Sequence, residues 1–463
     1  MSLLKRKNKQ ISASYNQDEI SLQNITPIDG RYKSQLLEFS NYFSEYAYIR
    51  YRIYVELQYL IFLSENGVAK KLSKKASDML LSIYTKFTLE DALQIKKREL
   101  VLNHDIKAIE YFLQEKLIAL SLDSYTPYIH WGITSDDANN LAYSLALSEC
   151  NTQVIVPNLQ NLLHIVKQIA LDDKKSILLA RTHGQPAVPT TFGKEIINFY
   201  VRLNQQLLTL KNFQFEGKLM GAVGNLNAHK CAFPKVNWIQ KSKTFVSSLG
   251  LTPNIFSTQI LPLDTWIAYF QTLTTINGIL GGLNRDMWTY IMLEEVKLKK
   301  KDGEVGSSTM PQKINPIDFE NAEGNGEIAN SYFQLYERKL ISSRLQRDLS
   351  DSIVKRTLGT ALSHTILSWK STQKGLQKIK FDLDVSRSHI NSHYEVLAEA
   401  IQTQLRLKND QEGYEKVKKM TRGKIMTKQL FQSLVSELGL KDLENLTPET
   451  YLGYAEELVE ESL

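Results

Sequence analysis

Apolar residues recur at intervals of three to five along much of the chain, a spacing typical of amphipathic helices. The segments from Asn151 to Leu171 and from Thr265 to Leu293 show it most clearly. Strict two-residue alternation, which would favour strands, is rare. No proline occurs between Pro316 and Pro448, so several long helices can run there without interruption. The pattern therefore predicts an all-α architecture.

Both segments also carry apolar residues away from their main stripe, such as Ile155 and Trp288. A helix that is apolar on more than one side is usually buried on more than one side. A central helical bundle that also forms a subunit interface would bury such helices. The alternative is a position deep inside one large monomeric core.

The length of 463 residues indicates two or three domains, and 43% apolar with 23% charged residues is typical of a folded protein. Turn-rich stretches near 123–127 and 380–386 mark the expected boundaries. The expected parts are a mobile tail over 1–24, a helical domain over 25–124, a central long-helix bundle over 125–379 with a functional loop at 297–316, and a C-terminal helical domain over 380–463.

Charge and cysteine content exclude several classes of protein. The net charge of +6 is modest for this length and does not by itself imply nucleic acid. Cys150 and Cys231 lie far apart, which argues against a disulfide scaffold and a cysteine zinc site. His389 and His393 lack the glutamate of a zincin motif, so no metal is expected. Without an apolar run long enough for a signal peptide or membrane anchor, a cytoplasmic protein is expected.

The segment from Gly303 to Asn325, GEVGSSTMPQKINPIDFENAEGN, holds the most informative cluster of polar residues. Its glycines, serines and threonine before a proline favour a loop whose backbone N–H groups could hold an anion. Lys313 and Asn315 follow directly. The alternative is a surface loop whose serine or threonine caps a helix.

His183 lies in a second segment, RTHGQPAVPTTFGKE, directly before Gly-Gln-Pro. That run forces a turn, so His183 is expected near the end of an element. A histidine there could act as an acid or base near neutral pH. The alternative is a core histidine satisfied by a carbonyl.

Three further segments could bind anions. Thr134-Ser135-Asp136-Asp137 is typical of a helix N-terminus, whose free N–H donors could instead bind a substrate carboxylate. Asn103-His104-Asp105 forms a second polar group. The segment 342–356, placed on a helix, would bring Arg344, Asp348, Ser352 and Arg356 onto one face. The alternative for that helix is a solvated face with intrahelical ion pairs.

Together these segments resemble the adenylosuccinate lyases of the fumarase/aspartase superfamily. GSSTMPQKIN at 306–315 is similar to the superfamily signature. The segments that narrow the resemblance follow the family's order over nearly the whole chain past the tail: DGRY at 29–32, NHD at 103–105, TSDD at 134–137, RTHGQP at 181–186, GAVGNLNAH at 221–229, IDFENAEGN at 317–325 and QRDLSDS at 346–352.

The resemblance implies a three-domain fold whose central bundle assembles into a homotetramer with active sites shared between subunits. It also implies a carbon–nitrogen lyase that needs no cofactor. Such an enzyme eliminates fumarate from adenylosuccinate to give AMP, and from the succinyl-carboxamide ribotide SAICAR to give AICAR, in purine biosynthesis. No nucleic acid or membrane partner is implied.

The same resemblance assigns roles to individual residues. Ser307 is the general base and His183 the general acid. Thr134, Ser135, Lys313 and Asn315 hold the succinyl carboxylates. The phosphate and ribose are held by Arg31, Tyr32, Arg347, Ser352 and Arg356, and the binding set is completed by Gln259, Asn103, His104 and Asp105.

One residue departs from the family pattern. Gln312 stands where adenylosuccinate lyases often have histidine, and argininosuccinate lyases often carry glutamine there. Argininosuccinate lyase is therefore the alternative enzyme. A non-enzymatic helical scaffold is the second alternative, and the presence of both Ser307 and His183 argues against it.

Overall fold

The computed structural model describes residues 22–299, 309–310, 312–408, 410, 412–422 and 426–462. Most of the predicted N-terminal tail lies outside these residues. The chain divides into two compact units. The described residues of unit 1 fall within 22–150, 215–262 and 342–364, and those of unit 2 within 151–214, 263–341 and 365–462.

Unit 1 is built from helices of moderate length. These are α2 (Ser40–Phe43), α3 (Glu45–Glu65), α4 (Lys74–Thr85), α5 (Leu89–Leu102), α6 (Asp105–Ala119), α7 (Ser135–Cys150), α10 (Asn227–Ala232), α11 (Trp238–Ser248) and α14 (Ser350–Lys355). Helix α3 packs against α7 and forms the centre of the unit. Its Ile53, Val55, Leu57 and Leu60 are completely buried. Burial of such side chains stabilises a fold by roughly 1.5–3 kcal/mol each, which fixes α3 as the scaffold for its neighbours.

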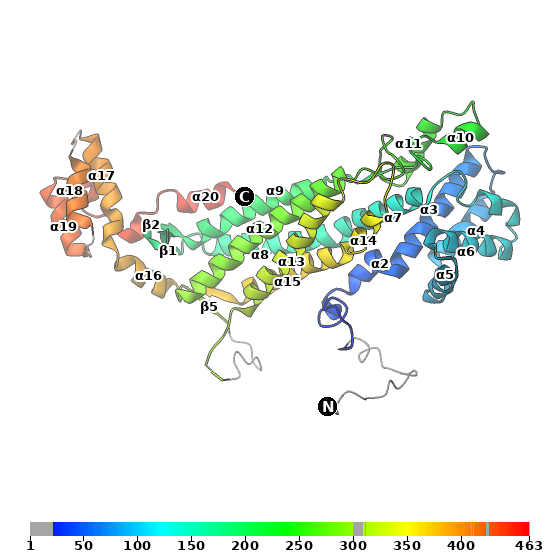
Figure 1. The fold of residues 1–463 in the computed structure, drawn as a ribbon. Helices are drawn as coiled ribbons and strands as arrows, with labels where there is room; N and C mark the ends of the chain where they lie inside the picture. The colour runs from blue at the N-terminus through cyan, green and yellow to red at the C-terminus, as the bar shows by residue number, and fades with distance from the viewer. Residues whose placement is uncertain are drawn as a thin grey trace, which may run out of the picture. The chain divides into compact units, whose positions relative to one another are not determined.

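Unit 2 contains the long helices that the apolar spacing predicted. Figure 1 shows α8 (Val156–Asp172), α9 (Phe192–Lys211), α12 (Asp264–Met292), α13 (Ile317–Lys339) and α15 (Leu358–Lys378), which begins in unit 1, running alongside one another. Phe270, Leu273 and Ile276 of α12 are fully buried among them. The all-α architecture with a long central bundle is therefore confirmed. The predicted 151–171 helix begins as a π-helical turn over Asn151–Ile155 before α8.

Within the part of the chain that the structure describes, the strands form three sheets of two strands each. β3 (Glu216–Gly217) pairs with β4 (Thr252–Pro253) in unit 1, whereas β1 (Ile177–Thr182) with β2 (Gln185–Thr191) and β5 (Val296–Leu298) with β6 (Ile379–Phe381) lie in unit 2. The β5–β6 pair shows that the first residues of the predicted loop at 297–316 are in a strand. The backbone N–H of Lys299 continues this contact by donating to the carbonyl oxygen of Lys378, the last residue of α15, at 2.7 Å.

The C-terminal part of unit 2 has its own apolar cluster. Helices α16 (Leu383–Asn391), α17 (Ala398–Leu407), α18 (Gly413–Thr421), α19 (Lys428–Glu437) and α20 (Ala455–Glu461) follow β6. Buried Ile390, Leu397 and Phe431 belong to this cluster, together with Ile177 and Leu179 of β1. The hairpin of β1 and β2 is therefore fixed at its base by apolar packing.

The predicted helix over 342–356 is wrong in its first half, because α14 covers only Ser350–Lys355. The carboxylate of Asp348 accepts hydrogen bonds from the backbone N–H groups of Arg344 and Ser350, at 3.2 and 2.8 Å. Leu345 has a left-handed backbone, with φ of 49°. A carboxylate that bonds to nearby backbone N–H groups competes with helix formation, so Arg344 and Asp348 do not share a helix face with Ser352.

Candidate active site

A polar cavity of about 490 Å³ lies within unit 1. It brings together predicted binding residues from three separate segments of the chain. Those that line it are Asn103, His104, Asp105, Ser135, Arg347, Ser352 and Arg356. We refer to it as the unit 1 pocket.

The junction of α5 and α6 supplies one wall of the unit 1 pocket. Asn103 ends α5 in the left-handed conformation, with φ of 52°. His104 then caps α6, and its Nδ1 accepts a hydrogen bond from the backbone N–H of Lys107 at 3.2 Å. Because Nδ1 is the acceptor, the neutral ring carries its proton on Nε2, which can donate to a substrate oxygen. Local capping chemistry thus explains the position of this motif.

Arg52 of α3 forms an ion pair with Asp105. Its guanidinium lies 3.1 Å from Asp105 Oδ2 and also donates to Asn139 Oδ1 at 2.7 Å. Burial alone would raise the pKa of Asp105, but Arg52 and the backbone N–H of Ile106 outweigh that effect and hold the pKa below its usual value. Asp105 is therefore an ionised acceptor at neutral pH.

Lys355 places a second buried cation at the wall of the unit 1 pocket. Its side chain is 5% exposed, and its ammonium lies 2.6 Å from Asp351 Oδ2, one helical turn earlier in α14. Burial would lower the pKa of Lys355, but the charges of Asp136 and Asp351 outweigh it and raise the pKa. Lys355 is therefore charged, and its charge is largely neutralised by these carboxylates.

Arg347 and Arg356 differ from Arg52 and Lys355 in lacking a carboxylate partner. Among the described residues, neither guanidinium takes part in an ion pair. Arg347 instead donates to Gln259 Oε1 at 3.0 Å. Ser352 lies between these arginines in sequence and lines the same pocket. Two guanidiniums beside a hydroxyl are suited to a phosphate group.

The start of α7 forms another part of the unit 1 pocket. Helix α7 begins at Ser135, as the sequence predicted, and Thr134 lies directly before it. Asp137 accepts a hydrogen bond from the backbone N–H of Thr134 at 2.9 Å, which fixes this turn. The partial positive charge of a helix N-terminus favours a bound carboxylate.

His183 lies in unit 2, at the tip of the hairpin formed by β1 and β2. Thr182 pairs with Gln185, so His183 and Gly184 form a two-residue turn. Their φ values of 53° and 74° are both positive, as a type I′ turn requires. The predicted element end is confirmed, and the imidazole is exposed rather than in the core.

The other predicted residues fall into three places. Lys313 is exposed and Asn315 half-buried in the segment before α13 of unit 2. Arg31 and Tyr32 precede the 3-10 helix Lys33–Gln35 in unit 1 and are not among the residues lining its pocket. The predicted base Ser307 lies outside the described residues.

Sequence reasoning did not assign binding roles to several residues lining the unit 1 pocket. These are Arg52, Glu99, Asp136, Asn139, Tyr143, Leu349, Asp351 and Lys355. Asp136 and Asp351 stood in the predicted motifs, and the four-residue spacing of Asp351 and Lys355 was a visible signal for an ion pair. Arg52 gave no such signal, because its partners Asn139 and Asp105 lie on other helices.

Comparison with known proteins shows the family of the chain. A family model described as lyase matches residues 30–328. A second model, described as adenylosuccinate lyase C-terminal, matches residues 343–452. The two matches meet near the start of the segment that carries Arg347, Ser352 and Arg356.

Solved structures match the fold over almost its full length. A 3-carboxy-cis,cis-muconate lactonizing enzyme from Pseudomonas putida has a TM-score of 0.76 at 18% identity, covering 93% of this chain and 97% of that one. A fumarate lyase from Mesorhizobium sp. BNC1 has a TM-score of 0.75 at 17% identity, covering 92% and 97%. The chain therefore shares the fold of these two enzymes.

Curated sequences define the family more closely. The adenylosuccinate lyase of Haemophilus influenzae is 41% identical over 449 residues, which covers 95% of this chain and 98% of that protein. The adenylosuccinate lyase of Escherichia coli K12 is 40% identical over 450 residues, covering 95% and 99%. The chain belongs to the adenylosuccinate lyase family, and this result does not favour argininosuccinate lyase.

Proposed function

We propose that this chain eliminates fumarate from adenylosuccinate to give AMP and from SAICAR to give AICAR. The observation that carries the proposal is the unit 1 pocket, in which Arg347, Arg356 and Ser352 lie with the Asn103–Asp105 motif and Ser135. Both substrates carry a phosphate and two carboxylates, so they require a site rich in uncompensated donors. Family membership supports the same reaction.

The reaction removes a weakly acidic proton from the carbon next to a carboxylate. Its removal loads negative charge onto that carboxylate, and the departing nitrogen must gain a proton. Preorganised donors at such a charge contribute roughly 3–4 kcal/mol each by analogy with oxyanion holes. A positioned general acid or base contributes roughly 10²–10⁴-fold. The site therefore needs a base, an acid and donors for both carboxylates.

We assign these tasks as the family resemblance implies. Ser307 takes the proton, and because a free serine is far too weak a base, Lys313 and nearby backbone N–H groups must stabilise its alkoxide. His183 protonates the leaving nitrogen. Its position on an exposed turn supports this role, because a satisfied core histidine could not reach a substrate.

Binding residues divide by the part of the substrate they hold. Thr134, Ser135, Lys313 and Asn315 take the succinyl carboxylates. Arg31, Tyr32, Arg347, Ser352 and Arg356 take phosphate and ribose, with Gln259, His104, Asn103 and Asp105 completing the set. The Nε2–H of His104 and the ionised carboxylate of Asp105 supply a donor and an acceptor for ribose hydroxyls.

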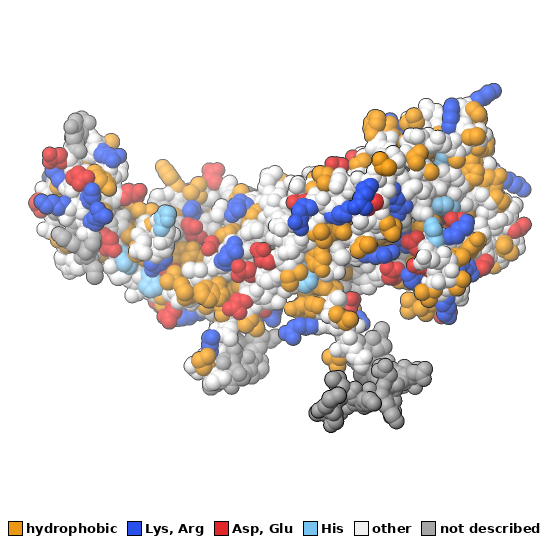
Figure 2. All heavy atoms as spheres, viewed as in Figure 1, with side chains coloured by type: hydrophobic (Ala, Val, Ile, Leu, Met, Phe, Trp, Pro, Cys, Tyr) orange, Lys and Arg blue, Asp and Glu red, His pale blue; other side chains and the backbone are white. Residues whose placement is uncertain are grey.

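We further propose a cytoplasmic homotetramer in which each active site draws residues from several subunits. Apolar side chains exposed on the long helices support this assembly, among them Trp288, Met292, Ile317 and Ile328. Figure 2 shows hydrophobic side chains among the charged ones on the surface of the helical bundle. No helix among the described residues is both long and apolar enough to cross a membrane. The domains expected over 25–124, 125–379 and 380–463 stay a prediction.

The direct test is to incubate the purified protein with adenylosuccinate and to follow its absorbance, with AMP and fumarate identified as products. Argininosuccinate serves as the control substrate, with arginine release as its readout. We expect turnover of adenylosuccinate alone. Release of arginine, or no reaction with either compound, would contradict the proposal.

A further inference from the structure

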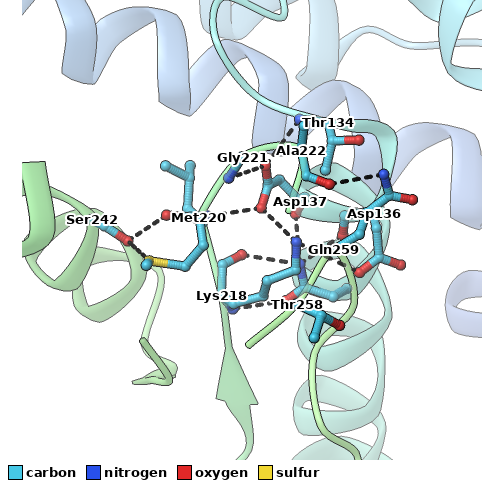
Figure 3. A network of polar contacts seen from close by, with 12 residues as sticks. Thr134, Asp136, Asp137, Lys218, Met220, Gly221, Ala222, Ser242, Thr258 and Gln259 are labelled. Carbon is cyan, nitrogen blue, oxygen red and sulfur yellow. Dashed lines mark hydrogen bonds and ion pairs between the residues drawn. The ribbon is translucent and has the colours of Figure 1, made fainter. Parts of the chain in front are cut away.

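Asp137 lies in the first turn of α7 and is completely buried. Its Oδ1 accepts hydrogen bonds from Lys218 Nζ at 2.8 Å and from the backbone N–H of Met220 at 2.9 Å. Its Oδ2 accepts from the backbone N–H groups of Thr134 at 2.9 Å and Gly221 at 3.0 Å. Figure 3 shows the carboxylate at the centre of these donors. One side chain thus joins the Thr134 turn to the segment 218–221.

Capping a helix does not require this arrangement. An N-cap needs one side-chain oxygen for one N–H group and no buried cation. Here both Asp137 and Lys218 have side chains with 0% exposure. A buried ion pair is weak evidence for stability, because packed apolar residues often serve as well or better. The pair therefore calls for an explanation other than stability.

The segment joined by Asp137 continues to the phosphate side of the unit 1 pocket. The carbonyl oxygen of Ala222 accepts a hydrogen bond from Gln259 Nε2 at 2.9 Å, and Gln259 Oε1 accepts from Arg347 at 3.0 Å. Gly224 allows its segment to lie close to the backbone of Ser257 and Thr258. Its φ is +85°, and an added Cβ would meet the carbonyl oxygen of Ser257 at 2.1 Å.

We propose that Asp137 is a positioning residue that sets the spacing between the Thr134 turn and Arg347 of the same chain. The inference rests on the proposed function, in which Thr134 and Ser135 hold a succinyl carboxylate and Arg347 holds the phosphate. Adenylosuccinate spans both groups, so its binding depends on their separation. AMP lacks the succinyl carboxylates and depends on the phosphate side alone. Both oxygens of Asp137 act as acceptors, one for Lys218 and Met220 and the other for Thr134 and Gly221.

The test compares the two ligands in the Asp137→Asn enzyme. An asparagine amide has only one acceptor oxygen, so its NH2 group must face either Lys218 and Met220 or Thr134 and Gly221, and two of the four hydrogen bonds are lost. Because misplacements of about 1 Å can cost up to about 10²-fold, we expect KM for adenylosuccinate to rise at least about tenfold, while the inhibition constant of AMP changes less than about twofold. Steady-state kinetics with AMP as competitive inhibitor measure both constants.

Two further variants keep the proposal testable if the Asp137→Asn enzyme does not fold. Ser242→Ala removes a hydrogen bond of 2.6 Å to the Leu219 carbonyl and loosens the same segment while keeping the ion pair. We expect the same change in the ratio of the two constants, by about threefold. Ser144→Ala is the matched control, because its hydrogen bond of 2.7 Å to the Glu216 carbonyl also ties α7 to the adjoining β3, two turns further along. It should lower Tm and leave the ratio unchanged.

Each outcome has a distinct meaning. If the wild-type enzyme does not convert adenylosuccinate, the proposed function itself is wrong. With an active wild type, the positioning role is overturned if every folded variant of Asp137 and Ser242 keeps the wild-type ratio. It is equally overturned if Ser144→Ala changes the ratio as much as they do.

Discussion

The unit 1 pocket and the hairpin of β1 and β2 hold their predicted functional residues in opposite ways. Around the pocket, charged side chains such as Arg52 and Lys355 are buried and paired before any ligand arrives. At the hairpin, His183 stands exposed on a two-residue turn with a left-handed backbone. Its base is fixed by apolar packing, and its tip is exposed.

This difference indicates that the pocket binds the substrate and that the hairpin supplies the general acid. A binding site must be preorganised, since ordering side chains on binding would weaken affinity. A general acid must reach the leaving atom, so an exposed turn that carries an imidazole is suited to complete a site elsewhere. The comparison predicts that changes at the hairpin act on turnover and that changes at the pocket act on affinity.

The largest effect is expected at the hairpin. His183→Gln removes the proposed acid, and kcat should fall by about 10²–10⁴-fold with little change in Tm, because the side chain is exposed. His164→Gln, an exposed histidine on α8, is the matched control and should keep wild-type turnover. Steady-state kinetics and thermal denaturation check both. If the His183→Gln enzyme kept a near-normal kcat, His183 would not be the general acid.

A comparable loss is expected in the loop before α13. Ser307→Ala should lower kcat by at least about 10²-fold while leaving the fold intact. Ser308→Ala tests which serine of the pair acts as the base, and it should retain most of the activity. The interpretation fails if the two effects are reversed, since Ser308 would then be the base.

At the pocket the effect should shift from kcat to KM. Arg347→Ala removes an uncompensated guanidinium, and we expect KM for adenylosuccinate to rise about 10–100-fold, because charge-assisted hydrogen bonds contribute about 1.5–3 kcal/mol. The control is Arg344→Ala, because Arg344 is exposed and does not line the pocket. If Arg347→Ala instead lowered kcat alone, the proposal that the pocket determines affinity and the hairpin determines turnover would be wrong.

The smallest effect concerns stability within unit 1. His130 Nδ1 lies 2.6 Å from Oε1 of the buried Glu56. Burial lowers the pKa of His130, but the Glu56 carboxylate outweighs it, so the pKa is raised. A raised pKa means that the charged pair stabilises the fold at low pH and that this contribution is lost as pH rises through the folded-state pKa.

Glu56→Gln should therefore lower Tm by about 1–3 °C more at about pH 5.5 than at about pH 9. Thermal denaturation of both proteins at the two pH values measures this difference. Glu45→Gln, which alters an exposed pair with Lys96, should give the same small change at both. An equal Tm loss for Glu56→Gln at both pH values would contradict the pairing.

The fold was predictable where one periodic signal spans a long segment. The helix expected from Thr265 to Leu293 is α12 at Asp264–Met292, because its apolar spacing continues without proline. The segment 342–356 was not predictable in the same way. Its charges fit a helical spacing, but Asp348 takes backbone N–H groups that the helix would need. Such competition depends on side-chain geometry that spacing does not record.

The site was predictable where a motif is local, as at Asn103–Asp105 and Thr134–Ser135, which lie at helix ends. Arg52 and Lys218 were missed, because the partners of each lie far along the chain. Lys218 pairs with Asp137, and only the folded chain brings these two residues together. Local motifs thus identified several of the residues that line the pocket, whereas buried cations with distant partners were missed.

Mixing the two inactive variants tests most directly the claim that the hairpin of one subunit completes the pocket of another. His183→Gln and Arg347→Ala enzymes, unfolded together and refolded as hybrids, are assayed at low adenylosuccinate concentration. If the two residues come from different subunits, some hybrid sites carry neither change, and the mixture should regain a substantial fraction of wild-type activity. A mixture that stays as inactive as its parents, although hybrids have formed, would contradict the account.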